Sequence, residues 1–276
     1  MAIPQLSSKG NTILASLLAK AAMKSRLLVQ GRLKCFELAV SLVEGKSGIE
    51  IGGPTDVFQP WQAIPRYYYG LSTPLPIYDR VGSLDNCNFS DQTIWSSHHE
   101  RFHFSRGRPP GRNIIAEGSN LSPVPDAAYD FVLSSHNLEH FANPVKALLE
   151  WKRITRRNGA LVLVLPDYRR TFDHNRTPTP VDHMMDDYEN NIGEEDTTHL
   201  PEVLQHHDVR MDGTLQTHTP EELRARSLAN VSNRCMHHHV FDENNSRELL
   251  ARVGLEVLAV ELALPYHIFI LSRWKE

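Results

Sequence analysis

Short apolar runs alternate with amphipathic stretches through the middle of this chain. The runs at 48–51, 131–133 and 161–165 are β-branched or wholly apolar, which is typical of strands buried on both faces of a parallel sheet. Between the last two runs, apolar residues recur near helical spacing over 145–154, and an Asn-Gly pair at 158–159 follows as the predicted helix end. This strand–helix–strand order predicts an α/β domain.

The same pattern divides the whole chain into four parts. A helical extension is expected over 1–45, a core over 46–168, an insertion over 169–240, and a helix and strands that complete the core over 241–276. Thr219-Pro220 within the insertion predicts a helix start, because Pro is favoured at the first helical position. The further elements expected are strands within 74–85 and at 113–116, 255–262 and 267–272, and helices over 27–44 and 246–253.

The first apolar run leads directly into Gly52, Gly53 and Pro54. A glycine turn lets the backbone approach a ligand closely, and the end of the first strand of an open α/β sheet is where nucleotide-like ligands bind. The spacing matches neither the dinucleotide fingerprint nor the P-loop. Because Glu50 precedes the pair and no phosphate cradle follows, the turn suits a ligand that carries a ribose and a positive charge.

Composition narrows the class of protein. The chain has 276 residues, a formal net charge of −4 and three scattered cysteines without a CxxC pair. These features predict a cytoplasmic protein with reduced thiols that is not a general nucleic-acid binder, and no apolar run is long enough to span a membrane. The apolar stripe over 13–21 is compatible with a signal peptide or a membrane-surface helix, but we favour a helix that packs on the core.

Three segments resemble a known family. They are Glu50-Ile-Gly-Gly-Pro, the run from Asp130 to His140, and Arg157-Asn-Gly-Ala-Leu with the following Leu165-Pro-Asp. Together they resemble the class I S-adenosylmethionine-dependent methyltransferases of the type 11-like group. One departure is the turn after the first strand, which is Gly-Gly-Pro here and commonly Gly-x-Gly in the family. The resemblance implies a doubly wound, mostly parallel, seven-stranded Rossmann-like sheet. Through 171–174, 194–199 and 237–242 the chain also resembles a bacterial branch of polysaccharide or glycosyltransferase context, which brings no assigned substrate.

The resemblance also implies where S-adenosylmethionine binds. An acid of the second strand should meet the ribose, for which we prefer Asp85 over Asp79, and Glu117 should lie near the adenine amino group. Trp61 and Tyr67 to Tyr69 form an aromatic cluster that either lines the substrate pocket or only packs on itself. The residues predicted to bind the cofactor are Glu50, Gly52, Gly53, Pro54, Asp85, Glu117, Ser135 and His136.

The fifteen histidines are the other unusual feature. No zinc-binding spacing is present, so we predict no metal site. A divalent ion held by histidines and carboxylates of the insertion is the alternative that the sequence leaves open. Histidine is suited to remove a proton from a methyl acceptor because its pKa lies near neutrality. We expect His136 or His140 to be this base, both on one side of a helix that begins at Ser135, with His174 as a further candidate.

These observations predict methyl transfer from S-adenosylmethionine to an oxygen or nitrogen of a small polar metabolite, with a sugar or glycoconjugate as one option. The insertion would act as a lid over the acceptor. One alternative is metal-assisted or non-methylating chemistry that uses the histidines. A second is a non-catalytic protein that binds the cofactor or a partner. The sequence leaves the acceptor and the oligomeric state open.

Overall fold

The computed structural model describes residues 33–59, 75–93 and 101–275 of the chain. The apolar stripe over 13–21 and the aromatic residues at 61 and 67–69 lie outside the described residues. The predicted helix over 27–44 is described in its second half, where α2 spans Phe36–Val43.

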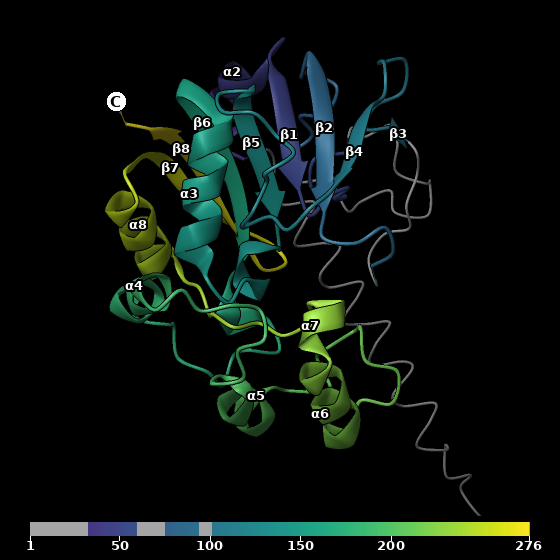
Figure 1. Cartoon of the computed structure of the whole chain (residues 1–276), viewed down its shortest axis with the longest axis vertical. Helices are drawn as coiled ribbons and strands as arrows, with labels where there is room; N and C mark the ends of the chain where they lie inside the picture. The colour runs from purple at the N-terminus through teal and green to yellow at the C-terminus, as the bar shows by residue number, and fades with distance from the viewer. Residues whose placement is uncertain (1–32, 60–74, 94–100, 276) are drawn as a thin grey trace, which may run out of the picture.

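The described residues form one eight-stranded sheet in the order β3-β4-β2-β1-β5-β6-β8-β7 (Figure 1). Five strands (β1, β2, β4, β5 and β6) run parallel, β8 is antiparallel to both of its neighbours, and β3 is a two-residue antiparallel edge. The predicted mostly parallel, doubly wound class is confirmed, with one short strand more than the seven expected. The strands are β1 Ser47–Ile51, β2 Ser83–Asn88, β3 Arg101–Phe102, β4 Gly111–Ile115, β5 Tyr129–Ser135, β6 Thr155–Pro166, β7 Leu255–Ala263 and β8 His267–Trp274.

The strand order reverses between β1 and β5. From β1 the chain builds outward through β2 and β4, and it then returns to the other side of β1 for β5 and β6. Ile51 at the end of β1 lies opposite Cys87 of β2 and Ser134 of β5, so the carboxyl ends of these strands meet at one edge. In an open α/β sheet this reversal opens a crevice in which ligands bind.

Two apolar layers hold the sheet between its helices. Along β6, Leu161, Leu163 and Leu165 join the cluster that includes α3 (Pro144–Ile154) and α8 (Glu243–Arg252), whereas Val162 and Val164 join the cluster that includes α2. The side chains of a strand point alternately to its two faces, which explains why this run is wholly apolar. Burial of each such side chain contributes about 1.5–3 kcal/mol.

Helix α3 ends earlier than the sequence predicts. It begins at Pro144, with the Asn143 side chain as its cap, but it ends at Ile154, and β6 starts at Thr155. The Asn-Gly pair at 158–159 lies inside β6, where Asn158 has a φ of 57° and the register with β5 is shifted. Asn and Gly tolerate this left-handed backbone in a strand irregularity as well as after a helix, so the prediction that they end the helix is wrong.

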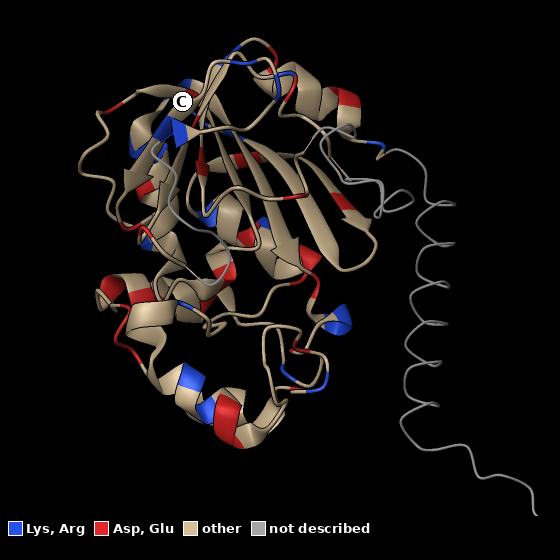
Figure 2. Cartoon of the chain, turned by 90° about the vertical axis from the view of Figure 1, so that its right-hand side faces the viewer, with Lys and Arg blue, Asp and Glu red and all other residues tan. Residues whose placement is uncertain are grey.

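The insertion is helical and lies beyond the carboxyl ends of the parallel strands (Figure 1). The predicted helix start is confirmed, since the Thr219 side chain accepts a hydrogen bond from the Glu222 amide at the beginning of α6. This helix carries acids and bases close together, as Figure 2 shows. Helix α8 begins at Glu243, ahead of the expected 246, because Asp242 and Asn245 form a capping box. The helices of the insertion are α4 Val181–Glu189, α5 Leu200–His206, α6 Pro220–Leu228 and α7 Asn230–Asn233. One 3-10 turn, η4 Tyr168–Arg170, lies where the insertion begins, and another, η3 Leu138–His140, lies between β5 and α3.

Among the described residues, no helix combines the length and the apolar character needed to cross a membrane.

Candidate functional site

A cavity lies where the carboxyl ends of β1, β2, β4 and β5 meet, and we call it the sheet-edge cavity. The turn after β1, the residues after β2 and β4, and the turn after β5 form its walls, and two residues of the insertion close it. This is the position that the reversal of strand order predicts for a ligand. The lining residues are Ile51, Gly52, Pro54, Thr55, Cys87, Asn88, Phe89, Thr93, Ala116, Glu117, Gly118, Ser135, His136, Asn137, His140, Phe141, Glu194 and Arg234.

The turn after β1 is a glycine turn for a steric reason. Gly52 has a φ of +84°, and a Cβ at this position would lie 2.7 Å from Cγ of Asn137. Its amide donates a hydrogen bond of 2.8 Å to the Cys87 carbonyl, and the Asn88 side chain donates one of 2.8 Å to the Gly53 carbonyl. The turn is therefore fixed to β2 with its backbone next to the cavity, as the sequence predicts for a close approach to a ligand.

Glu50 and Gly53 lie beneath this turn and not in the cavity wall. Glu50 is 1% exposed, accepts a hydrogen bond from the Tyr78 hydroxyl, and would be overlapped by a Cβ at Gly53. Burial raises the pKa of Glu50 to about 8. Both residues therefore support the turn from behind and do not line the cavity, contrary to the expectation that they contact the cofactor.

The structure contradicts the two acids proposed for the ribose. The second strand extends to Asn88, so Asp85 lies opposite Ile49 in the middle of β2. Its carboxylate is 2.8 Å from Nη2 of Arg112 and accepts a hydrogen bond from the Tyr129 hydroxyl, away from the cavity. Asp79 is an exposed residue before the strand. Asn88, and not Asp85, is the last residue of β2. The prediction misplaced the strand end because the half-polar sequence of β2 does not mark where the strand stops.

Glu117 follows β4 and lines the cavity as predicted, but it already has a partner. Its Oε1 is 2.5 Å from Nη2 of Arg234, which comes from the insertion. The Arg234 guanidinium also lies 5.1 Å from the centre of the Phe89 ring and 3.8 Å from Oε2 of Glu194. Burial raises the pKa of Glu194 to about 7. A charged group of the insertion therefore closes the sheet-edge cavity.

Ser135 and His136 also line the cavity, although no helix begins there. His136 has a φ of 49°, and the turn η3 starts only at Leu138. His140 nevertheless lines the same cavity. Nε2 of His136 lies 2.7 Å from Nδ1 of His267 at the start of β8. Burial, and then the neighbouring histidines, lower the pKa of His136 well below its ordinary value, so this imidazole is neutral at pH 7.

A second cavity of about 310 Å³ adjoins the first, and we call it the insertion cavity. His136 and His140 line both cavities, so they form the wall that the two share. The remaining lining comes mainly from the insertion and from the turn before β8. Its members besides the two shared histidines are Glu139, Pro166, Arg170, Thr171, Phe172, Met211, Asp212, Gly213, Thr214, Arg226, Cys235, His237 and Tyr266.

A buried charged group stands behind the insertion cavity. Nδ1 of His237 lies 2.5 Å from Oδ2 of Asp173, and the buried Arg176 donates a hydrogen bond of 3.0 Å to Oδ1 of the same carboxylate. Although burial raises the pKa of Asp173, the charges of His237 and Arg176 outweigh it and hold the pKa at about 2. Sequence reasoning noted the run of three histidines but did not single out His237.

His174, the third predicted base, lies outside both cavities. Its Nδ1 lies 3.0 Å from the Thr171 carbonyl and its Nε2 lies 3.9 Å from Asp208. Glu139, which sequence reasoning did not select, lies at the shared wall instead, with Oε1 3.9 Å from Nδ1 of His136. It is 1% exposed, and burial raises its pKa to about 7.

Comparison with known proteins agrees with this arrangement. Residues 95–163, which contain β5, α3 and most of β6, match the model of a methyltransferase domain family. The match confirms the resemblance to class I S-adenosylmethionine-dependent methyltransferases, and with it methyl transfer as the activity and S-adenosylmethionine as the cofactor. No curated protein sequence matches the chain.

Solved structures of low sequence identity are similar to this chain. A SAM-dependent methyltransferase from Aquifex aeolicus is 13% identical, with 91% of this chain and 98% of that chain covered at a TM-score of 0.45. A SAM-dependent methyltransferase from Methanosarcina mazei is 11% identical, with 88% and 99% covered at a TM-score of 0.46.

The sheet-edge cavity has a volume of about 200 Å³, and the chemistry of its lining suits this cofactor. Gly52 leaves open the space beside the turn, and Phe89 and Phe141 supply apolar walls suited to a flat base. Asn88 and Glu117 place an amide and a carboxylate at the ends of β2 and β4, where ribose hydroxyls and an amino group find hydrogen-bond partners. The polar groups are few and the walls partly apolar, as is usual for a cofactor pocket.

Proposed function

We propose that this protein transfers a methyl group from S-adenosylmethionine to an oxygen or nitrogen of a small polar acceptor, with a sugar or glycoconjugate as the first class to test. One observation carries the proposal. His136 and His140 line both the sheet-edge cavity, whose lining suits the cofactor, and the insertion cavity. An acceptor in the insertion cavity would therefore meet the cofactor at the two histidines.

The chemistry of the insertion cavity supports a hydroxylated acceptor. Its volume of about 310 Å³ is at the lower end for small-molecule sites, which run from about 300 to 1,000 Å³. Phe172 and Tyr266 supply aromatic faces, and Arg170 and Thr214 supply hydrogen-bonding groups. This combination suits a ligand with both apolar faces and hydroxyl groups.

His136 is the proposed base. In the tautomer that we assign, Nε2–H donates to Nδ1 of His267, which leaves the lone pair on Nδ1 of His136 to accept a proton. That atom lies 3.9 Å from Oε1 of Glu139, which would stabilise the imidazolium once the proton has arrived. The bound cofactor supplies the methyl group, and the residues of the shared wall orient the acceptor and take its proton.

The test combines binding with turnover. Calorimetry with S-adenosylhomocysteine should show one site per chain. Incubation with S-adenosylmethionine labelled in its methyl group, together with a panel of free sugars, nucleotide sugars and amino sugars, should then transfer label to an acceptor hydroxyl or amine. A chain that binds no S-adenosylhomocysteine contradicts the cofactor site. Binding without transfer to any compound of the panel contradicts the acceptor class and favours a non-catalytic role.

A further inference from the structure

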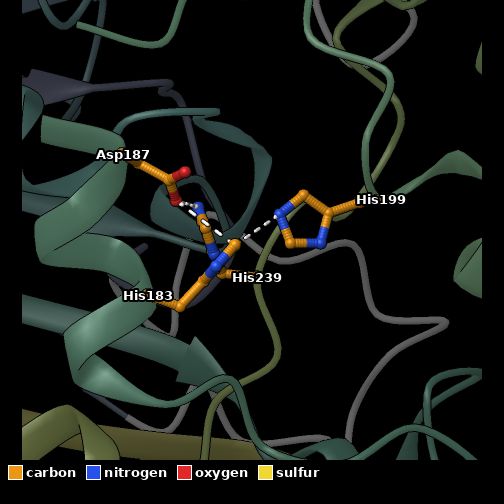
Figure 3. Close-up of side chains that lie close together, drawn as sticks. All are labelled: His183, Asp187, His199 and His239. Carbon is orange, nitrogen blue, oxygen red and sulfur yellow. Dashed lines mark hydrogen bonds and ion pairs between the residues drawn. The ribbon is translucent and has the colours of Figure 1, made fainter. Parts of the chain in front are cut away.

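Four side chains converge at a place that methyl transfer does not use. His183 and Asp187 lie one turn apart on the same side of α4, His199 directly precedes α5, and His239 lies in the segment before α8. Their ring nitrogens and a carboxylate oxygen all lie within 4.8 Å of one another. Figure 3 shows the three rings and the carboxylate directed toward a common centre.

The separations between these atoms match those between the ligands of a tetrahedral metal ion. Nε2 of His183 is 3.1 Å from Nε2 of His199 and 3.5 Å from Oδ2 of Asp187, and Nε2 of His239 is also 3.5 Å from that oxygen. Ligand bonds of about 2.0–2.1 Å at tetrahedral angles place neighbouring ligand atoms about 3.3 Å apart. Three of the six separations thus lie near this value, and all six lie within 4.8 Å.

One buried oxygen at the centre of the group lacks a hydrogen-bond partner. Oδ2 of Asp187 is buried without one in the described part of the chain, and Nε2 of His183 and Nε2 of His239 each lie 3.5 Å from it. Nε2 of His239 also lies 3.3 Å from the Ala142 carbonyl, a contact that it would exchange for the ion. Buried polar groups are normally satisfied, and a cation at the centre would supply the missing partner of Asp187.

We propose that His183, Asp187, His199 and His239 bind a divalent transition-metal ion of the zinc type. Imidazole suits zinc and its neighbours in the first transition series, and four protein ligands without an open position are typical of a structural site. The ion ties α4, which packs on the core, to the start of α5 and to the segment that carries His237 of the insertion cavity. Its role is to hold the insertion in place.

The surroundings agree with such a site. Nδ1 of His199 faces Oε2 of Glu202 at 3.8 Å, and metal-bound histidines commonly direct their second nitrogen to a carboxylate. The His183 side chain is 41% exposed, which gives an ion a route of entry. The prediction of no metal site relied on linear spacing, which cannot detect ligands from three separate segments.

The experiment uses the full chain without a His tag. After removal of metals with a chelator, Zn²⁺ is titrated against a chromophoric competitor, and the protein is also loaded with Co²⁺. We expect one Zn²⁺ per chain, a tetrahedral Co²⁺ absorption spectrum, and a higher melting temperature for the loaded protein. Asp187→Asn and His199→Gln should each weaken Zn²⁺ binding by at least about 10- to 100-fold, since even the loss of residues that only orient metal ligands costs that much.

His206→Gln is the matched control, because it removes a histidine of α5 that lies outside the group. This variant should bind Zn²⁺ like the parent. The proposal is overturned if the parent binds no ion, or if Asp187→Asn and His199→Gln bind Zn²⁺ as the parent does. The latter result would direct attention to Glu139, His140 and His237, whose ligand atoms also lie within 4.8 Å of one another. His183→Gln changes the more exposed ligand, whose side chain is 41% exposed, and gives a second test of the same site if another variant fails to fold.

Discussion

The sheet and the insertion are held together by different forces. In the sheet, the residues that fill the two layers are apolar, and Trp151, Phe131 and Phe269 are fully buried. In the insertion, the separate apolar cluster contains only Val203, Leu215, Leu223 and Met236 as buried members. Its other buried positions are largely charged or polar, and they include Asp173, Arg176, Asp187, Asp212, His237, His238 and His239.

This difference indicates which region can change its conformation while the rest of the fold stays intact. Apolar burial is non-directional and depends little on pH, whereas a buried charge needs each of its partners. We therefore expect the insertion to open or close as its charges and ligands change, while the sheet stays intact. The two histidines that line both cavities lie at the boundary between these two regions.

The largest expected effect lies at that boundary. His136→Asn should lower kcat by about 10²–10⁴-fold, the usual cost of removing a general base, and should leave the affinity for S-adenosylhomocysteine unchanged. His206→Gln serves as the control histidine and should keep the parental rate. Turnover by His136→Asn at the parental rate would remove His136 from the chemistry.

The pH profile of the parent sharpens this test. The base must be neutral, so activity falls as the pH drops through its pKa. That pKa is lowered by burial and by His267, His237 and His140, with Glu139 as the acid that faces it. The acid limb should therefore lie well below pH 6.5, lower than the near-neutral limb that an unperturbed histidine predicts. A limb near neutrality would indicate that another group takes the proton.

A pair of substitutions compares the two regions directly. Arg176→Met leaves the buried Asp173 carboxylate without its arginine, and removal of one partner of a buried ion pair costs about 3–5 kcal/mol. Leu163→Ala in β6 should cost about 2–5 kcal/mol through the cavity that it leaves. Hydrogen exchange should show faster opening confined to 169–240 for the first variant and across the sheet for the second. Equal effects on both regions would contradict the comparison.

Glu50 is the exception within the sheet, because its stability contribution depends on pH. Its folded pKa of about 8 lies above the unfolded value of 4.5, so the folded state keeps a proton that the unfolded state loses. That contribution is fully present below pH 4.5 and is lost as the pH rises through 8, by up to about 1.4 kcal/mol per pH unit. Glu50→Gln should therefore melt higher than the parent at pH 8.5 and like it at pH 4. An equal difference at both pH values would contradict the assigned pKa.

The smallest effect is expected at the contact between the regions. Arg234→Gln breaks the ion pair with Glu117. The Arg234 side chain is 13% exposed, but that of Glu117 is 37% exposed and stays solvated, so the loss of this pair should cost only about 0–1 kcal/mol. The variant should change the affinity for S-adenosylhomocysteine by at most about fivefold, and the difference should shrink at high salt. A loss of binding would show that Arg234 contacts the cofactor.

Local patterns in the sequence predicted most of the sheet. The run at 48–51 with its glycine turn, the unit from 131 to 165 and the cap at Thr219 each depend on neighbours within a few residues. Asp85 was misplaced because β2 has the sequence Ser-Leu-Asp-Asn-Cys-Asn, whose weak apolar pattern does not mark its end. The Asn-Gly pair at 158–159 was predicted to end a helix because left-handed backbone is common there. The same backbone conformation also occurs at irregularities within strands, which is where the pair lies.

The site was less predictable because its parts come together only in three dimensions. His136 and Glu117 could be chosen because each follows a strand, and strand ends meet at one edge. His237 and Asp173, 64 residues apart, pair through the fold of the insertion. The same holds for the four residues of the proposed metal site, of which only His183 and Asp187 share a helix.

A crystal structure with S-adenosylhomocysteine bound is the most direct test of the shared wall. The ligand should occupy the sheet-edge cavity with its base toward Glu117 and Phe141, and its sulfur should lie next to His136, on the side of the insertion cavity. That result would place the methyl group at the proposed base and at the acceptor. A sulfur that faces away from His136, or a ligand bound outside the sheet-edge cavity, would contradict the proposed function.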